Sequence, residues 1–157
     1  MGNKINIVLN EPEIPQNTGN ISRTCSVIGA ALHIIRPIGF EISDKTLKRA
    51  GLDYWDTLEV HYYDSYADFE KAHSSDLIYY FSSHAERIYT EPDFSEGDIY
   101  LMFGKESVGL DRELVRKNAK TALRIPMLEG KRCLNLSNSV AVAVYEVLRK
   151  RGFSGLV

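Results

Sequence analysis

Three polar segments carry most of the side chains that could do chemistry. They are residues 10–20, 104–110 and 127–137, and their amide, hydroxyl and carboxylate groups supply hydrogen-bond donors and acceptors for a ligand. Arg23 follows the first segment and lies about 200° from Ile21 on a helical wheel, so it points away from the apolar stripe. A guanidinium there suits an anionic ligand, and a solvated surface arginine is the ordinary alternative.

The third polar segment continues into a helix. Residues 131–139 read Lys-Arg-Cys-Leu-Asn-Leu-Ser-Asn-Ser, which is very polar for a stretch that precedes an apolar helix. Its amide groups could bind a ligand, or they could satisfy the unpaired N–H groups at the start of that helix. Spacing alone leaves both interpretations open.

The glycines of the second segment do not indicate a nucleotide phosphate-binding loop. Gly104 and Gly109 have the spacing of a phosphate-binding loop, but Leu110-Asp111 stands where that loop needs Lys followed by Ser or Thr. A tight turn between a strand and a helix, which needs glycine for its backbone conformation, is the favoured interpretation.

Hydrolase and metalloprotease motifs are missing as well. Neither G-x-S-x-G nor H-E-x-x-H occurs. Ser83 and His84 are neighbours in the sequence, which does not make a catalytic triad. We interpret His33, His61 and His73 as structural or solvated.

Strand-like and helix-like segments alternate along the chain and would position the polar segments. The expected strands are residues 5–9, 32–35, 57–63, 76–82, 99–103 and 122–125. The expected helices are residues 17–30 (capped by Asn17-Thr18), 43–51 (short and basic), 64–72, 111–120 and 138–151 (capped by Ser137), and residues 83–97 are expected to be irregular. Residues 140–144 are apolar nearly all round, so the first half of the last helix is expected to be buried on every side.

This alternation predicts one α/β domain over residues 1–157, with a mainly parallel sheet and helices on both faces. Ligands of such sheets bind beyond the carboxyl ends of the strands. The three polar segments fall at those ends, so they are expected to form the site.

Composition narrows the class of protein. The 157 residues carry 19 basic and 21 acidic side chains, a net charge of −2, so nucleic-acid binding would need a local basic patch. The candidate patches are Lys45 with Lys48 and Arg49, Lys131 with Arg132, and Arg149 with Lys150 and Arg151; ordinary solvated charges are the alternative for each. Two distant cysteines, no membrane-length apolar run and no signal-peptide pattern predict a cytoplasmic protein without a zinc site.

The motifs together resemble those of a known enzyme family. They are residues 17–23 (Asn-Thr-Gly-Asn-Ile-Ser-Arg), residues 101–110, and residues 125–127 with 134–140 and Tyr145-Glu146, in the family's order. The chain resembles the SPOUT-class RNA 2′-O-ribose methyltransferases over essentially its whole length. Residues 6–15 and 49–54 are similar to the TrmL subgroup, which acts on the tRNA wobble nucleotide, position 34.

The resemblance implies a C-terminal deep trefoil knot and a homodimer in which each active site is completed by the partner chain. It implies S-adenosyl-L-methionine as methyl donor, without a metal. The cofactor-binding positions would be Phe81, Gly104, Ile125, Cys133, Leu134 and Asn138, with Cys133 standing where the family usually has Ser. The catalytic positions would be Arg23, Asn17, Glu106, Asn135, Ser137 and Tyr145.

The implied reaction fits these residue types. Methyl transfer from a sulfonium to a ribose 2′-OH needs positioning and removal of a proton, with no covalent nucleophile. A guanidinium stays protonated and is a poor base, so we expect Arg23 to hold a phosphate near the target ribose of the tRNA anticodon stem-loop.

Three alternatives remain. The first is the same chemistry on another RNA, such as rRNA. The second is a non-catalytic module that binds S-adenosylmethionine or RNA, and the third is a flavodoxin-like or receiver-like signalling domain. The intact motifs, with Arg23 among them, disfavour the last two.

Overall fold

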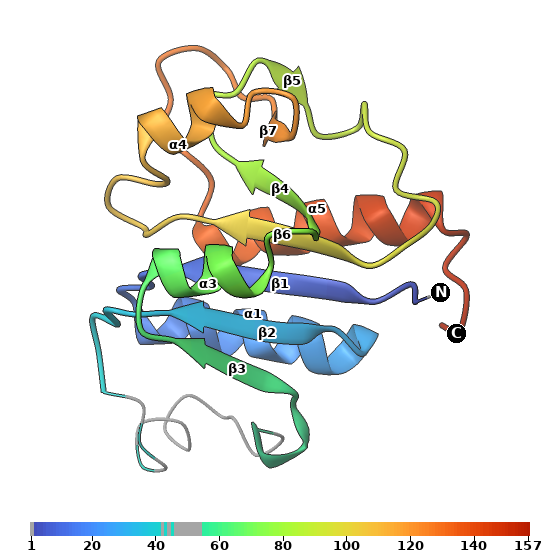
Figure 1. Cartoon of the computed structure of the whole chain (residues 1–157). Coiled ribbons are helices and arrows are strands. Elements are labelled where there is room, and N and C mark those ends of the chain that lie inside the picture. Colours follow the sequence, from blue (N-terminus) through green and yellow to red (C-terminus); the bar gives the residue numbers. More distant parts are fainter. Residues whose placement is uncertain (1, 42, 44, 46–54) are drawn as a thin grey trace.

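Seven parallel strands form one sheet in the computed structural model, which describes residues 2–41, 43, 45 and 55–157. The strands are β1 (Ile5–Asn10), β2 (Ala31–Ile35), β3 (Val60–Tyr63), β4 (Leu77–Phe81), β5 (Arg87–Ile88), β6 (Ile99–Phe103) and β7 (Ala122–Arg124). Their order across the sheet is β3-β2-β1-β6-β4-β7-β5, and every pair is parallel. The carboxyl ends of all strands therefore meet at one edge of the sheet (Figure 1).

Helices cover both faces of this sheet, as the sequence predicted. They are α1 (Pro15–Ile28), α3 (Tyr66–Ala72), α4 (Arg112–Lys117) and α5 (Leu136–Lys150), with a short 3-10 helix, η1 (Trp55–Thr57). Ile21 of α1 and Val140 of α5 share one buried cluster with Ile7 and Leu101 of the sheet. Phe69 of α3 and Val115 of α4 belong to a second cluster on the opposite face.

The predicted strands are confirmed with small shifts at their ends. β3 begins at Val60 because the preceding residues form η1. The excursion over residues 83–97, predicted as irregular, contains the two-residue strand β5 at the sheet edge. Such a short strand carries too little periodicity to be recognised in a sequence. The predicted basic helix at 43–51 lies largely outside the described residues.

The predicted N-caps of α1 and α5 are wrong. Pro15 is the first residue of α1, where its missing N–H costs nothing, so Asn17 and Thr18 lie inside the helix and are buried. Asn135, and not Ser137, caps α5, since its side chain accepts from the N–H of Ser137. α1 thus starts two residues before its predicted cap at Asn17, and α5 starts one residue before its predicted cap at Ser137.

The first half of α5 is not buried on every side. One face of this helix packs on the sheet, but Val142 is 38% exposed and Tyr145 is 46% exposed on the other face. The apolar composition predicted burial correctly only for the face that the sheet covers. In the single chain, the opposite face leaves apolar groups in solvent.

No helix among the described residues is both long and apolar enough to cross a membrane. The trefoil knot implied by the resemblance stays a prediction.

Candidate active site

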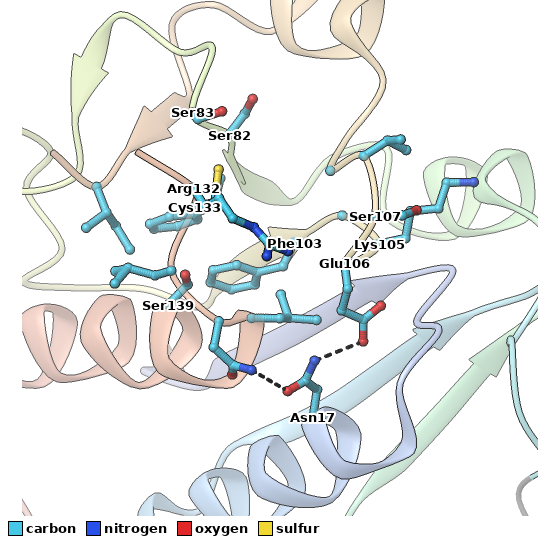
Figure 2. Close-up of a pocket in the computed structure, with 18 of the residues that line it drawn as sticks. Asn17, Ser82, Ser83, Phe103, Lys105, Glu106, Ser107, Arg132, Cys133 and Ser139 are labelled. Atoms are coloured by element: carbon cyan, nitrogen blue, oxygen red, sulfur yellow. Dashed lines mark hydrogen bonds between the residues drawn. The ribbon is translucent and has the colours of Figure 1, made fainter. Parts of the chain in front are cut away.

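A cleft of about 510 Å³ opens at the carboxyl edge of the sheet. The segments that follow β4, β6 and β7 line it, together with the start of α1 and of α5 (Figure 2). Its volume lies in the range of about 300–1,000 Å³ that is usual for small-molecule sites. The three polar segments therefore meet, as predicted from their position after parallel strands.

The floor of the cleft is apolar. The rings of Phe81 and Phe103, which end β4 and β6, stack with centroids 4.7 Å apart. Ile125, directly after β7, also lines the cleft. Flat apolar walls with polar rims are typical of sites that take an aromatic ligand group.

The loop after β6 is a tight turn that requires both of its glycines. A Cβ atom on Gly104 would lie 2.1 Å from the carbonyl carbon of Gly109, a backbone contact that no side chain can relieve. Gly109 has a φ of 72° and donates its N–H to the carbonyl oxygen of Lys105 at 2.8 Å. The turn interpretation of this glycine pair is confirmed.

Glu106 ties this loop to the start of α1. Its carboxylate accepts hydrogen bonds from the backbone N–H of Glu13 at 2.8 Å and of Ile14 at 3.0 Å. These amides belong to the unpaired donors that precede a helix, where a negative charge is stabilised. Because both carboxylate oxygens are engaged by the protein, Glu106 acts as a positioning residue in this structure.

Asn17 connects Glu106 to the third segment. Its Nδ2 donates to Glu106 Oε1 at 3.3 Å, and its Oδ1 accepts from Asn135 Nδ2 at 3.0 Å, as the dashed lines in Figure 2 show. Asn135 Oδ1 in turn accepts from the N–H and hydroxyl of Ser137 at 2.9 and 2.6 Å. One chain of hydrogen bonds thus joins all three polar segments.

A second set of hydrogen bonds, which the sequence did not predict, also joins the first two segments. Glu13 Oε1 accepts from the N–H and the hydroxyl of Ser107 at 3.1 and 2.6 Å. These hydrogen bonds lower the pKa of Glu13 and keep it ionised. Lys105 Nζ lies 3.4 Å from Glu11 Oε2 in the same interface.

Most of the predicted site residues line the cleft. They are Asn17, Phe81, Gly104, Glu106, Ile125, Cys133, Leu134 and Asn135. Ser137 is buried beneath it through its bonds to Asn135. Arg23, Asn138 and Tyr145 are exposed and do not line the cleft of their own chain.

The cleft also contains residues that were not among the predicted catalytic and cofactor-binding positions. Ser82, Ser83, Lys105, Ser107, Arg132 and Ser139 are among its lining residues (Figure 2). Ser82 and Ser83 directly follow β4, so their place after a buried strand was the available signal. Ser139 belongs to the third motif, at 134–140, so its place in that motif was the available signal.

The C-terminal basic patch has structural partners. Arg149 forms two hydrogen bonds to the buried carboxylate of Glu146, at 2.8 and 2.9 Å, which lower the pKa of Glu146. Lys150 Nζ donates to the carbonyl oxygens of Thr90 and Pro92, both at 2.5 Å. Arg151 donates to the carbonyls of Phe94, Asn3 and Gly97. Lys150 and Arg151 therefore hold residues 90–97 against the end of α5.

The other two patches differ in how much of them the structure describes. Lys131 and Arg132 are exposed, and Arg132 lines the cleft, which makes this pair a candidate for contact with RNA. Of the first patch, only Lys45, which is exposed, belongs to the described residues. Within those residues, no group of three or more His, Cys, Asp or Glu side chains is placed to hold a metal ion.

Similar proteins extend over almost the whole chain. A protein of Geobacillus stearothermophilus is 49% identical over 154 residues, covering 97% of this chain and 98% of its own. A protein of Escherichia coli strain K12, named tRNA (cytidine(34)-2′-O)-methyltransferase, is 43% identical and covers 98% of both chains.

Solved structures agree with these relatives. One described as giving structural insights into the 2-OH methylation of C/U34 on tRNA is 44% identical, with a TM-score of 0.87 over 97% of this chain and 99% of its own. The model of the SpoU rRNA methylase family matches residues 4–145. The resemblance seen in the three sequence motifs is thereby confirmed, and the chain belongs to the SpoU methylase family.

Proposed function

We propose that the protein is a tRNA methyltransferase that transfers a methyl group from S-adenosyl-L-methionine to the ribose 2′-OH of the wobble nucleotide 34, in the cytoplasm. The observation that carries this proposal is the similarity of almost the whole chain to relatives named for that reaction. The E. coli protein is 43% identical to this chain. The cleft supports it, because residues from all three motifs that carry the likeness line the cleft.

The cleft suits the methyl donor. The stacked Phe81 and Phe103 rings and Ile125 offer an apolar wall for an adenine, and the backbone of residues 104–109 and 132–135 offers polar groups at its rim. A SpoU methyltransferase from Streptomyces viridochromogenes that shares this fold, with a TM-score of 0.81 and 20% identity, is described in complex with AdoMet. Cys133 lines the cleft, and its thiol is exposed. A thiol is a weaker hydrogen-bond partner than the serine hydroxyl that the family usually has at this position, so we expect the backbone of Cys133 to contact the donor.

S-adenosylmethionine, when bound, supplies a methyl group on a sulfonium, ready for in-line displacement at carbon. The residues of this chain then have to hold the ribose in line and to keep its phosphates in place. Asn17, Glu106 and Asn135 fix the segments around the donor through their hydrogen bonds. We assign the phosphate contact to Arg23, whose charge is permanent.

Arg23 is exposed on α1 and does not line the cleft of its own chain. The helices α1 and α5 also expose apolar groups: Val27 of α1 is 63% exposed, and Val142 and Tyr145 of α5 are 38% and 46% exposed. Since α1 and α5 pack side by side on one face of the sheet, these groups form a surface for a second copy. We therefore propose a homodimer in which Arg23 of each copy completes the partner's site.

A transfer assay with mapping of the product tests the function. Purified protein, labelled S-adenosylmethionine and under-modified tRNA should yield a 2′-O-methyl mark at nucleotide 34. Arg23→Ala should abolish transfer. It should leave the affinity for S-adenosylmethionine within about twofold of wild type, because Arg23 does not line the cleft that would hold the donor. A methyl mark on rRNA alone, or donor binding without any transfer, would overturn the proposal.

Mixed dimers test the shared site. Cys133→Trp should block the cleft from an exposed loop position, so this variant and Arg23→Ala are each expected to be inactive. After the two are mixed and allowed to exchange subunits, half of the dimers are mixed and each has one complete site, so about a quarter of wild-type activity should return. No recovery would show that Arg23 acts within its own chain.

A further inference from the structure

A shallow groove lies at the carboxyl ends of β2 and β3, beside the cleft and outside all three motifs. It is lined by Arg36, Pro37, Ile38, Phe40, Tyr62 and Asp64. The two aromatic rings and Ile38 give it apolar walls. Arg36 places a charge at its rim.

Arg36 and Tyr62 form a preorganised pair in this groove. The guanidinium carbon of Arg36 lies 5.0 Å from the centroid of the Tyr62 ring, over its face. The Tyr62 residue is 38% exposed, so the pair can be reached by a ligand. A guanidinium or an aromatic ring held in this way is a stacking surface for unpaired bases.

The charge of Arg36 is only loosely neutralised. Among the described residues, Arg36 forms one ion pair, which joins its Nη1 to Asp64 Oδ1 at 3.3 Å, and the side chain of Asp64 is 88% exposed. An exposed pair of this kind contributes little to stability, so a phosphate can displace the carboxylate at small cost.

The loop beside the groove contacts the loop that precedes α1 at the cleft. Gly39 donates its N–H to the carbonyl oxygen of Pro12 at 2.9 Å, and Glu11 donates to that of Ile35 at 2.9 Å. A Cβ atom on Gly39 would lie 2.9 Å from the Cα atom of Glu13, so the two loops touch directly. Because Glu13 and Ile14 are in turn bound to Glu106, the groove is held in a fixed position relative to the cleft.

We propose that this groove binds an unpaired nucleobase of the RNA loop that carries the methylated ribose, with the base stacked on the Arg36–Tyr62 pair and its phosphate on Arg36. This inference rests on the proposed function, which supplies an RNA with unpaired loop nucleotides. The net charge of −2 gives the chain no bulk attraction to RNA, so affinity has to come from local contacts such as these.

Affinity for an anticodon stem-loop RNA, measured by fluorescence anisotropy, tests the groove. Tyr62→Leu keeps an apolar side chain but removes the ring, and should raise the Kd about 5- to 100-fold, whereas Tyr62→Phe should stay near wild type. Arg36→Gln should raise the Kd and flatten its salt dependence. Asp64→Asn frees Arg36 and should lower the Kd.

An abasic scan identifies the bound nucleotide. Removing the base at one loop position should weaken binding to wild type but not to Tyr62→Leu, because the same contact is then already lost. Phe153→Leu is the matched control, since Phe153 is 44% exposed and lies after α5, at the opposite edge of the sheet. It should change nothing.

The outcomes separate this inference from the proposed function. If wild type methylates nucleotide 34 and Tyr62→Leu binds RNA as tightly as wild type, the groove has another occupant and the inference is wrong. If wild type binds RNA without methylating it, the proposed function fails while the Tyr62→Leu affinity still decides the inference. Wild type that binds no RNA would overturn both.

Discussion

Replacing Glu106 by glutamine is the sharpest test of how the site is organised. Glu106 accepts from two backbone N–H groups before α1 and from the amide of Asn17. Gln has nearly the same shape, but it has no charge and one of its two terminal atoms donates instead of accepting. At least one of the two backbone amides must then lose its partner.

The expected cost follows from these contacts. A hydrogen bond to a charged group contributes about 1.5–3 kcal/mol, and the interaction of a negative charge with a helix N-terminus adds about 0.3–1 kcal/mol. Glu106 is only partly buried, so the upper end of this range does not apply. We expect Glu106→Gln to lower the free energy of unfolding by about 2 kcal/mol, a fall in Tm of about 4–8 °C for a domain of this size.

Thermal denaturation and calorimetric titration with S-adenosylmethionine measure the two consequences. The variant should unfold earlier and bind the donor several-fold more weakly, because residues 104–109 line the cleft and lose their anchor on α1. Glu129→Gln, a change of the same kind at an exposed position, should alter the free energy of unfolding by no more than about 0.5 kcal/mol. A Tm and a donor affinity both equal to those of Glu129→Gln would refute the role assigned to Glu106.

Three further predictions concern other parts of the molecule. Burial, followed by the nearby His61 and His73, lowers the pKa of His33 to about 3, so only the unfolded state binds this proton between about pH 3 and 6.5. Stability should therefore fall as pH drops below 6.5, by about 1 kcal/mol at pH 5.5, and urea denaturation of His33→Gln should show a flatter pH dependence than wild type. The thiol of Cys25 is buried, which raises its pKa to about 12, while Cys133 is exposed in the cleft. A maleimide should label Cys133 alone in the native protein, and saturating S-adenosylmethionine should protect it; labelling of Cys25 at the same rate would contradict the fold. Gly104→Ala should cost more than about 2 kcal/mol and weaken donor binding, because its Cβ meets backbone at Gly109, and a wild-type denaturation midpoint would show that the turn can relax.

The sheet and its two helix layers could be predicted because a short stretch of sequence indicates each strand and helix. Apolar runs such as Ile5–Leu9 and Ile99–Phe103 became central strands, and their length and alternation with helices implied parallel pairing. Helix starts were less predictable. Asn17 is a good N-cap by type, but Pro15 begins the helix and Glu106, distant in the sequence, supplies the acceptor.

Most of the predicted site residues line the cleft, but the hydrogen bonds that join them could not be predicted from the sequence. Motif reasoning brought Asn17, Glu106 and Asn135 together, but the bond between Asn17 and Asn135 joins residues 118 positions apart, which no spacing rule reaches. The bond between Glu13 and Ser107 left no sequence signal at all. The basic residues 149–151 are the opposite case. Their charge made them a candidate for RNA contact, but their side chains are hydrogen-bonded to backbone carbonyl groups and to Glu146.

Because residues 149–151 are already hydrogen-bonded within the chain, we expect RNA to contact other cations. α5 begins at the cleft and ends near the opposite edge of the sheet, beside the chain termini (Figure 1), so its last residues lie away from the cleft. Among the described residues, the exposed cations near the carboxyl edge include Arg36, directly after β2, and Lys131 and Arg132, both in the loop after β7. These side chains place positive charge beside the cleft of a single copy. If two copies pair through α1 and α5, Arg23 of the partner would add to this charge, so we expect dimer formation to determine RNA affinity as well as turnover.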